Sequence, residues 1–210
     1  MSQNKTNFAV PLAFVGMMFF AIGFALGINS FLIPVLKGAL SLPSGVAYLL
    51  LAATFVPFLI FGYPASATIA KIGYKRTMAL SFLIFAVAFI LFVLSAKLEN
   101  FILFLIASFV SGAANAYLQA SVNPYITILG PIESAAKRMS IMGICNKLAW
   151  PVAPLFFALV VADQTNVQTS DLYLPFYIII GVFLLLGIIS LMAPLPEVKA
   201  AGEDESDTAN

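Results

Sequence analysis

Long apolar stretches alternate with short polar segments along the chain. Six stretches reach the length of about 20 residues that a helix needs to cross a bilayer, and they cover residues 10–36, 44–69, 77–96, 100–127, 139–161 and 173–194. Backbone N–H and C=O groups must be hydrogen-bonded inside a membrane, and these stretches are too long and too evenly apolar for barrel strands. The pattern therefore predicts an all-α membrane protein with six transmembrane helices.

Composition indicates that a bilayer surrounds the chain. Hydrophobic residues make up 62% of the sequence and charged residues only 9%, whereas soluble domains carry about 25% charged residues. The net charge of +1 argues against a nucleic-acid partner. Cys145 is the single cysteine, so no disulfide can form within the chain.

Lysine and arginine are distributed unevenly between the two ends of the predicted helices. Under a six-helix count, one side holds Lys5, Lys71, Lys75, Arg76, Lys137, Arg138 and Lys199. The opposite side holds Lys37 and Lys97, and Lys147 lies inside a helix. Because cytoplasmic loops carry the excess of basic residues, both termini are expected in the cytoplasm.

The chain is expected to hold one membrane domain and a short tail. Residues 1–196 form the predicted six-helix domain, and residues 197–210 form an acidic cytoplasmic tail or linker of small and polar residues. The N-terminal apolar run follows one lysine and has no small-residue cleavage site. It is therefore interpreted as a first transmembrane helix and not as a signal peptide.

A weak internal repeat relates the first and fourth helices. Residues 23–34 read GFALGINSFLIP and residues 113–124 read AANAYLQASVNP. Each segment starts with a small residue, has an amide five positions before a proline, and ends in that proline. Two inverted three-helix units would produce this relation, as in many transporters. Three matches in twelve positions also arise by chance.

Polar residues follow one face of the fourth predicted helix. They recur every three or four positions, at Ser108, Gly112, Asn115, Gln119 and Asn123. An unpartnered amide in hydrocarbon costs several kcal/mol, so this face must meet other helices or a water-filled space. Small and amide residues commonly join helices. Five positions exceed what packing needs, so we favour a lining for polar cargo.

Lys147 is the one charged residue well inside a predicted helix, and all nine acidic residues lie in loops or in the tail. A central lysine costs roughly 2.5–3.5 kcal/mol on insertion scales and indicates a functional site. Lys147 lies about 13 Å beyond Arg138 along a helix, which makes it level with Gln119. The alternative is that its ammonium reaches the membrane surface.

An amide, a cation and an aromatic ring together suit a polyhydroxylated ligand. Asn146 precedes Lys147, and Trp150 lies one turn later. The predicted cargo-binding residues are Asn29, Asn115, Gln119, Asn123, Asn146, Lys147 and Trp150.

Four segments resemble the fucose–proton symporter family, which includes bacterial glucose/galactose permeases and belongs to the major facilitator superfamily. LQASVNPYITILGP (118–131) and RMSIMGICNKLAWPVAP (138–154) resemble that family's fourth and fifth helices. GINSFLIPVLK (27–37) resembles its first helix, and PASATIAKIGYKR (64–76) resembles the loop after its second. The resemblance covers nearly the whole chain.

The resemblance implies a fold, a cargo and a location. It implies one six-helix half of a twelve-helix sugar transporter that works by alternating access in the bacterial inner membrane. The second half would be another copy of this chain, a separate C-terminal half, or the remainder of a longer transporter of which this chain is the N-terminal half. It implies Asn146 as a sugar contact and a set of gating or loop-motif residues, namely Lys71, Gly73, Lys75, Arg76 and Arg138.

Two departures concern the driving ion. Where proton-coupled members carry an aspartate and a glutamate, this sequence has Ser30 and Gln119. With no acidic residue inside a predicted helix and no histidine, the chain has no evident proton-binding group. Proton coupling in the missing half, sodium coupling and facilitated diffusion all stay open.

Enzymatic activity is not expected. A six-helix intramembrane serine protease needs a histidine base, and the sequence has no histidine. The predicted helices also hold no cluster of metal-ligating residues, so neither a metal nor a cofactor is expected. A membrane scaffold that transports nothing remains the alternative function.

Overall fold

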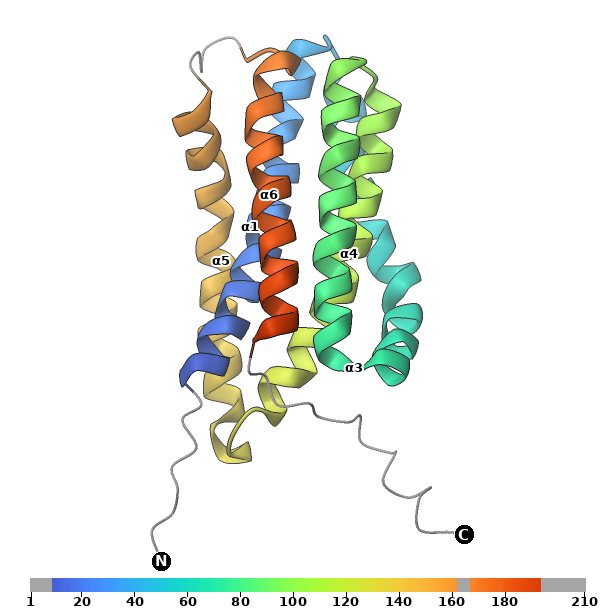
Figure 1. Cartoon of the computed structure of the whole chain (residues 1–210). Helices are drawn as coiled ribbons and strands as arrows, with labels where there is room; N and C mark the ends of the chain where they lie inside the picture. Colours follow the sequence, from blue (N-terminus) through green and yellow to red (C-terminus); the bar gives the residue numbers. More distant parts are fainter. Residues whose placement is uncertain (1–8, 162–166, 194–210) are drawn as a thin grey trace, which may run out of the picture.

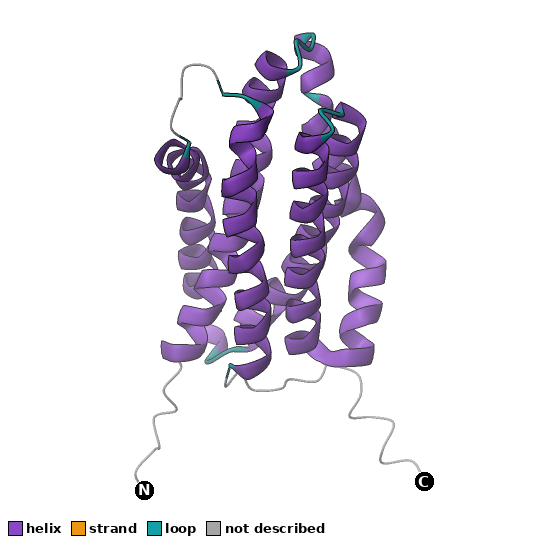
Figure 2. Ribbon diagram, turned by 45° about the horizontal axis from the view of Figure 1, so that its top comes forward, coloured by secondary structure: helices purple, strands orange, loops and turns teal. Residues whose placement is uncertain are grey.

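The computed structural model describes residues 9–161 and 167–193, and within them the regular structure is entirely helical (Figure 2). The long helices are α1 (Ala9–Ala39), α3 (Leu49–Lys97), α4 (Phe101–Ile128), α5 (Ala135–Val160) and α6 (Tyr173–Met192). The short elements are α2 (Ser44–Ala47) and the 3-10 turns η1 (Ile132–Ser134) and η2 (Thr169–Leu172). The all-α prediction is confirmed for this part of the chain. The predicted tail, 197–210, lies outside it.

Five helical segments of the described chain are long and apolar enough to cross a membrane. The segment Ser44–Lys97 has 54 residues, and as one straight helix it would extend about 80 Å, far beyond a hydrocarbon core of about 30 Å. The backbone breaks inside it at Gly73, where φ is 81° and ψ is 169°. Glycine adopts a positive φ at no steric cost. The break falls in the polar segment KIGYKR that separates two predicted helices.

The chain turns back at Gly73, so α3 has a first arm before this residue and a second arm after it (Figure 1). At the same end of the bundle, α1 begins, α4 passes to α5, and α6 ends (Figure 1). We call this the Gly73 end. Lys97 and the start of α4 lie at the opposite end.

The largest offsets from the predicted spans lie at two helix starts, because α3 begins at Leu49 where residue 44 is predicted, and α5 begins before its predicted start. The predicted start was residue 139, whereas α5 begins at Ala135 and includes Lys137 and Arg138. Hydropathy places the start of an apolar run after its last charge. A helix can instead extend past the charges, because its polar first turn lies outside the hydrocarbon.

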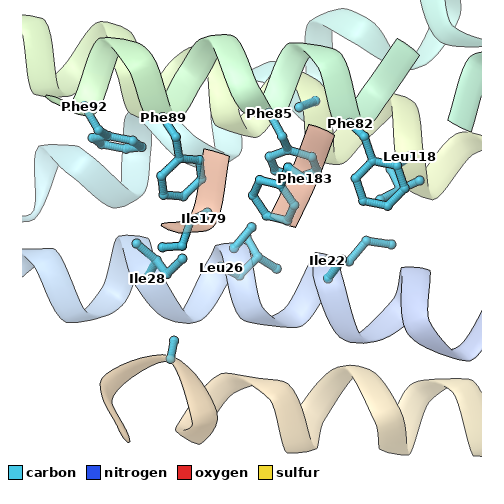
Figure 3. Packing of buried hydrophobic residues seen from close by; sticks show 14 of the residues in the cluster. Ile22, Leu26, Ile28, Phe82, Phe85, Phe89, Phe92, Leu118, Ile179 and Phe183 are labelled. Atoms are coloured by element: carbon cyan, nitrogen blue, oxygen red, sulfur yellow. The ribbon is translucent and has the colours of Figure 1, made fainter. Parts of the chain in front are cut away.

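Phenylalanines join α3 to α6. The rings of Phe85 and Phe183 lie 4.8 Å apart between centroids, and those of Phe89 and Phe176 lie 5.7 Å apart. Figure 3 shows this row of rings from α3 facing Ile22, Leu26 and Ile28 of α1, with Ile179 and Phe183 of α6 between them. These side chains form the apolar centre of the bundle.

Glycines bring other helix pairs into backbone contact. A Cβ atom added at Gly23 of α1 would lie 1.9 Å from the carbonyl oxygen of Asn146 on α5, and one at Gly27 would lie 2.6 Å from that of Trp150. A Cβ atom added at Gly112 of α4 would lie 2.1 Å from the carbonyl oxygen of Thr54 on the first arm of α3. Only glycine permits these close approaches.

At the end opposite Gly73, polar contacts hold the helix ends. The Asn100 side chain accepts hydrogen bonds from the backbone N–H groups of Ile102 (3.0 Å) and Leu103 (3.2 Å), and so caps α4. The Lys97 ammonium lies 5.9 Å from the ring centroids of both Tyr173 and Tyr177. These contacts fix the second arm of α3 to the start of α6.

Candidate functional site

Asn29 joins α1 to α4. It is fully buried, and its Nδ2 donates to the Ala25 carbonyl (3.1 Å) and to Ser111 Oγ (3.4 Å). Ser108 Oγ donates to Asn29 Oδ1 at 3.1 Å. Both ends of the amide are therefore used between helices. This part of the polar face is a packing contact, and Asn29 does not line an open space in this structure.

Asn115 lies one turn beyond Ser111 on α4 and is also fully buried. Among the described residues, neither its Nδ2 nor its Oδ1 has a hydrogen-bond partner. An unpartnered buried amide costs free energy, which hydrophobic replacement would remove. The same face of α4 thus binds the amide of Asn29 and, one turn later, carries the amide of Asn115, which has no hydrogen-bond partner among the described residues.

Gln119 and Asn123 continue this face toward the Gly73 end. Both are partly exposed, in contrast to Asn29 and Asn115. At about 100° per residue, Gln119 lies within about 40° of Asn115 around the helix axis. The polar face of α4 therefore changes along its length from a buried contact to a partly exposed surface.

On α5, three predicted residues occupy different surroundings. Asn146 donates from Nδ2 to the Phe19 carbonyl of α1 at 3.1 Å. Lys147 is exposed, and its Nζ lies 5.0 Å from the centroid of the Trp150 ring. Trp150 is partly buried, and its Nε1 has no partner among the described residues. The structure thus brings Lys147 and Trp150 together as a cation–π pair.

The contacts of α5 with α1 show which way Lys147 faces. Asn146 and Trp150 meet the glycines of α1, and Lys147 lies about 100° around the helix from Asn146. That flank carries the small or polar residues Ser140, Gly143, Pro151 and Pro154.

The exposed large apolar residues of α5 form a different face, about 160–220° from Asn146, made of Ile141, Ile144, Leu148, Leu155 and Leu159. That face suits lipid or another apolar helix. Lys147 lies between it and α1, outside the apolar stripe.

The predicted loop motif lies at the break in α3. Lys71 and Arg76 are exposed and Lys75 is partly exposed, on either side of Gly73. The Tyr74 ring lies 5.9 Å from the ring of Tyr125, the buried aromatic residue that follows Asn123 and Pro124. The loop motif therefore packs against the Gly73 end of α4.

Arg138 joins the end of α4 to the start of α5. It is only 7% exposed. Its Nε donates to the Ile126 carbonyl (3.1 Å), and its terminal nitrogens donate to the carbonyls of Thr127 (3.0 Å) and Pro131 (2.8 Å) and to Ser134 Oγ. A cation at the carboxyl end of a helix satisfies free carbonyls and complements the helix dipole.

Sequence reasoning identified Arg138 but missed this capping role. The signal was the turn Leu129-Gly130-Pro131, in which Gly130 has a φ of 108°. This turn brings the start of α5 back to the last carbonyls of α4.

Two grooves are lined by other residues than the predicted cargo-binding ones. One of about 250 Å³ runs between α1, α5 and α6 and has apolar lining only, including Phe24, Phe156 and Phe183. Another of about 320 Å³ is lined by Phe31, Pro154 and Val161 among others. Neither contains a predicted cargo-binding residue. Within the described residues, no group of three or more His, Cys, Asp or Glu side chains could hold a metal ion.

A family model described as Major Facilitator Superfamily matches residues 14–209. The chain is 31% identical over 209 residues to a glucose/galactose transporter of Brucella abortus, covering 97% of this chain and 50% of that protein. It is 22% identical to the L-fucose-proton symporter of Escherichia coli, covering 97% and 51% respectively. The chain thus spans about half the length of the curated relatives it matches.

The fold is similar to half of a solved transporter. The crystal structure of the Major Facilitator Superfamily transporter FucP in the outward conformation matches with a TM-score of 0.76 and 23% identity, over 91% of this chain and 51% of that chain. The arrangement of the helices described above is therefore that of half of such a protein.

Proposed function

Because the chain belongs to the Major Facilitator Superfamily, we propose that it is one six-helix half of a membrane transporter that carries a sugar or a similar polyhydroxylated solute by alternating access. One observation carries this proposal: 97% of the chain aligns at 31% identity with half of a glucose/galactose transporter. A second six-helix half completes the pathway.

Transport by the completed assembly tests this function. The chain is reconstituted in proteoliposomes with its second half, and counterflow of radiolabelled D-galactose, D-glucose and L-fucose is measured against protein-free liposomes. At least one sugar is expected to exchange. Asn146→Ala is expected to reduce that exchange more than tenfold, because the amide that faces cargo is lost. No exchange of any of the three sugars would leave the scaffold function standing.

We propose that α3 crosses the membrane twice, which gives six transmembrane helices in two inverted units of three. The contacts support this. Gly23 of α1 meets a carbonyl of α5, and Gly112 of α4 meets a carbonyl of the first arm of α3. In a six-helix count these are contacts of the first helix with the fifth and of the fourth with the second. A two-fold axis between the units exchanges the two contacts.

Five residues are proposed to contact the cargo, all on α4 and α5: Gln119, Asn123, Asn146, Lys147 and Trp150. Lys147 is exposed and the other four are partly exposed, which supports this role. For Asn29, which is fully buried, we propose a positioning role instead: its contacts to Ser108 and Ser111 set the distance between α1 and α4, and so the orientation of Gln119. Asn115 is also fully buried, and we propose no cargo contact for it.

Transport is proposed not to depend on a protonatable residue of this half. Ser30 stands where proton-coupled members of the family resembled carry an aspartate. Its hydroxyl donates to the Leu26 carbonyl of its own helix at 3.1 Å. Glu133 and Asp171 lie in η1 and η2, at helix ends. The test replaces Glu133, Asp163 and Asp171 singly by the corresponding amides and measures proton-driven uptake and counterflow. Both activities are expected to persist in all three variants. Loss of proton-driven uptake with intact counterflow in any variant would contradict the proposal.

The chain is proposed to lie in the bacterial cytoplasmic membrane with the Gly73 end and both termini in the cytoplasm. The basic residues beside Gly73 and at the start of α5 support this orientation. In a Cys145→Ser background, single cysteines at positions 74 and 135 are expected to react from the inside, and those at 98 and 168 from the outside. The opposite pattern would overturn the orientation.

A further inference from the structure

Lys147 has no carboxylate partner within the described chain. The acidic residues there are Glu99, Glu133 and Asp171, and each lies in a loop or a 3-10 turn at a helix end. The contact that the structure gives the ammonium is the Trp150 ring, 5.0 Å from Nζ. An aromatic face attracts a cation but leaves its charge in place. A positive charge is therefore available on this flank of α5.

The neighbouring amide complements this charge. Asn146 uses its Nδ2 to bond the Phe19 carbonyl, which fixes the amide and leaves Oδ1 able to accept a hydrogen bond. A solute held between the two residues would meet an acceptor suited to a hydroxyl and a cation suited to an anion. Neutral sugars use only the first of these groups fully.

We propose that Lys147 selects a sugar that carries a carboxylate, as in a uronic acid. This inference rests on the proposed transport function and narrows its substrate class. An ammonium on a flexible stem suits a single carboxylate as a point charge. The cost of a lysine at membrane depth is then offset when cargo is bound.

The alternative partner is a fixed carboxylate of the second half, which would pair with Lys147 only while the two halves are closed over it. The Trp150 ring holds the ammonium against its own helix. The contact therefore keeps the cation within this half and available to cargo.

The test uses D-galactose and D-galacturonate, which differ only at C6. The completed transporter is reconstituted, and each compound competes for counterflow of radiolabelled D-galactose. Galacturonate is expected to compete at a concentration at least tenfold lower than galactose. In Lys147→Met this ratio is expected to fall to about one, and in Lys147→Arg, which keeps the charge, most of the preference is expected to remain. Size-exclusion chromatography verifies that the variants are folded.

The wild-type measurement alone can overturn the inference. If galacturonate competes no better than galactose, the site does not select a carboxylate, and a partner acid in the second half becomes the better explanation of Lys147. A preference that survives in Lys147→Met would exclude Lys147 as its source. If no sugar exchanges in the wild type, the proposed function itself fails, which is a different result from exchange without preference.

Discussion

Two sides of the bundle are held together in different ways. The polar side, made of α1, α4 and α5, uses glycines that bring backbones into contact and single polar side chains such as Asn29 and Arg138. The phenylalanine side, made of the second arm of α3 and of α6, uses overlapping rings such as Phe85 and Phe183. Within a bilayer, both sides are stabilised by close packing, because the hydrophobic effect contributes little to helix association in lipid.

The difference lies in how much each side depends on a single atom. A backbone contact through glycine allows no added carbon, and a buried donor has no substitute of the same geometry. A group of rings can rearrange after one substitution, since neighbouring rings still fill the space. Specific positions are therefore concentrated on the polar side, where the proposed cargo residues also lie.

The largest effect is expected from Gly23→Ala. The added Cβ atom would overlap the Asn146 carbonyl, so α1 and α5 must move apart. The free energy of unfolding is expected to fall by about 3 kcal/mol, measured by denaturant titration in mixed micelles. Gly62→Ala is the control, because nothing lies within 4 Å of a Cβ atom there. Equal stability of the two variants would show that the polar side does not depend on the glycine contact between α1 and α5.

A smaller loss is expected when Arg138 is changed to methionine. The carbonyls of Ile126, Thr127 and Pro131 lose their donor. Hydrogen bonds to a charged group contribute about 1.5–3 kcal/mol, so a loss of about 2 kcal/mol is expected in the same titration. Lys137→Met, at the exposed neighbour, should leave stability unchanged. Similar losses in both variants would show that charge, and not capping, matters.

The phenylalanine side is expected to tolerate Phe183→Leu. The smaller side chain leaves a partial cavity among the rings of Phe82, Phe85 and Phe89, which is expected to cost about 1 kcal/mol. Phe55→Leu, at an exposed position, is the control. A loss larger than that of Gly23→Ala would reverse the ranking of the two sides.

Replacement of the two buried asparagines, Asn115 and Asn29, should change the free energy of unfolding in opposite directions. Asn115→Leu removes an amide without partners and is expected to raise the free energy of unfolding by about 0.5–1 kcal/mol. Asn29→Leu removes the contacts to Ser108 and Ser111 and is expected to lower it. A destabilised Asn115→Leu variant would mean that Asn115 has a partner, such as an internal water molecule.

Much of the fold could be predicted from the sequence, because a bilayer leaves an apolar chain few ways to pair its backbone. The break at Gly73 coincided with a charged segment in the pattern. The surroundings of Asn29 could not be predicted in the same way. Periodicity in one helix states which residues share a face, but not which helix that face meets.

Arg138 shows the same limit at a loop. The sequence identifies Arg138 as a candidate residue, but its capping contacts depend on how Gly130 redirects the chain. The surroundings of Lys147 could be predicted from the sequence only in part. Its position at membrane depth and its aromatic neighbour were predicted from spacing, whereas the flank on which it lies could be found only from the contacts of α5 with α1.

The pairing of Lys147 with Trp150 also has a spectroscopic consequence. Trp150 is the only tryptophan of the chain, so ultraviolet emission excited at the red edge of the protein absorption band arises from one place. That place is the ring under the ammonium. Any event that moves the cation alters the electric field across the indole and hence its emission wavelength. The chain thus carries an intrinsic optical reporter that needs no label.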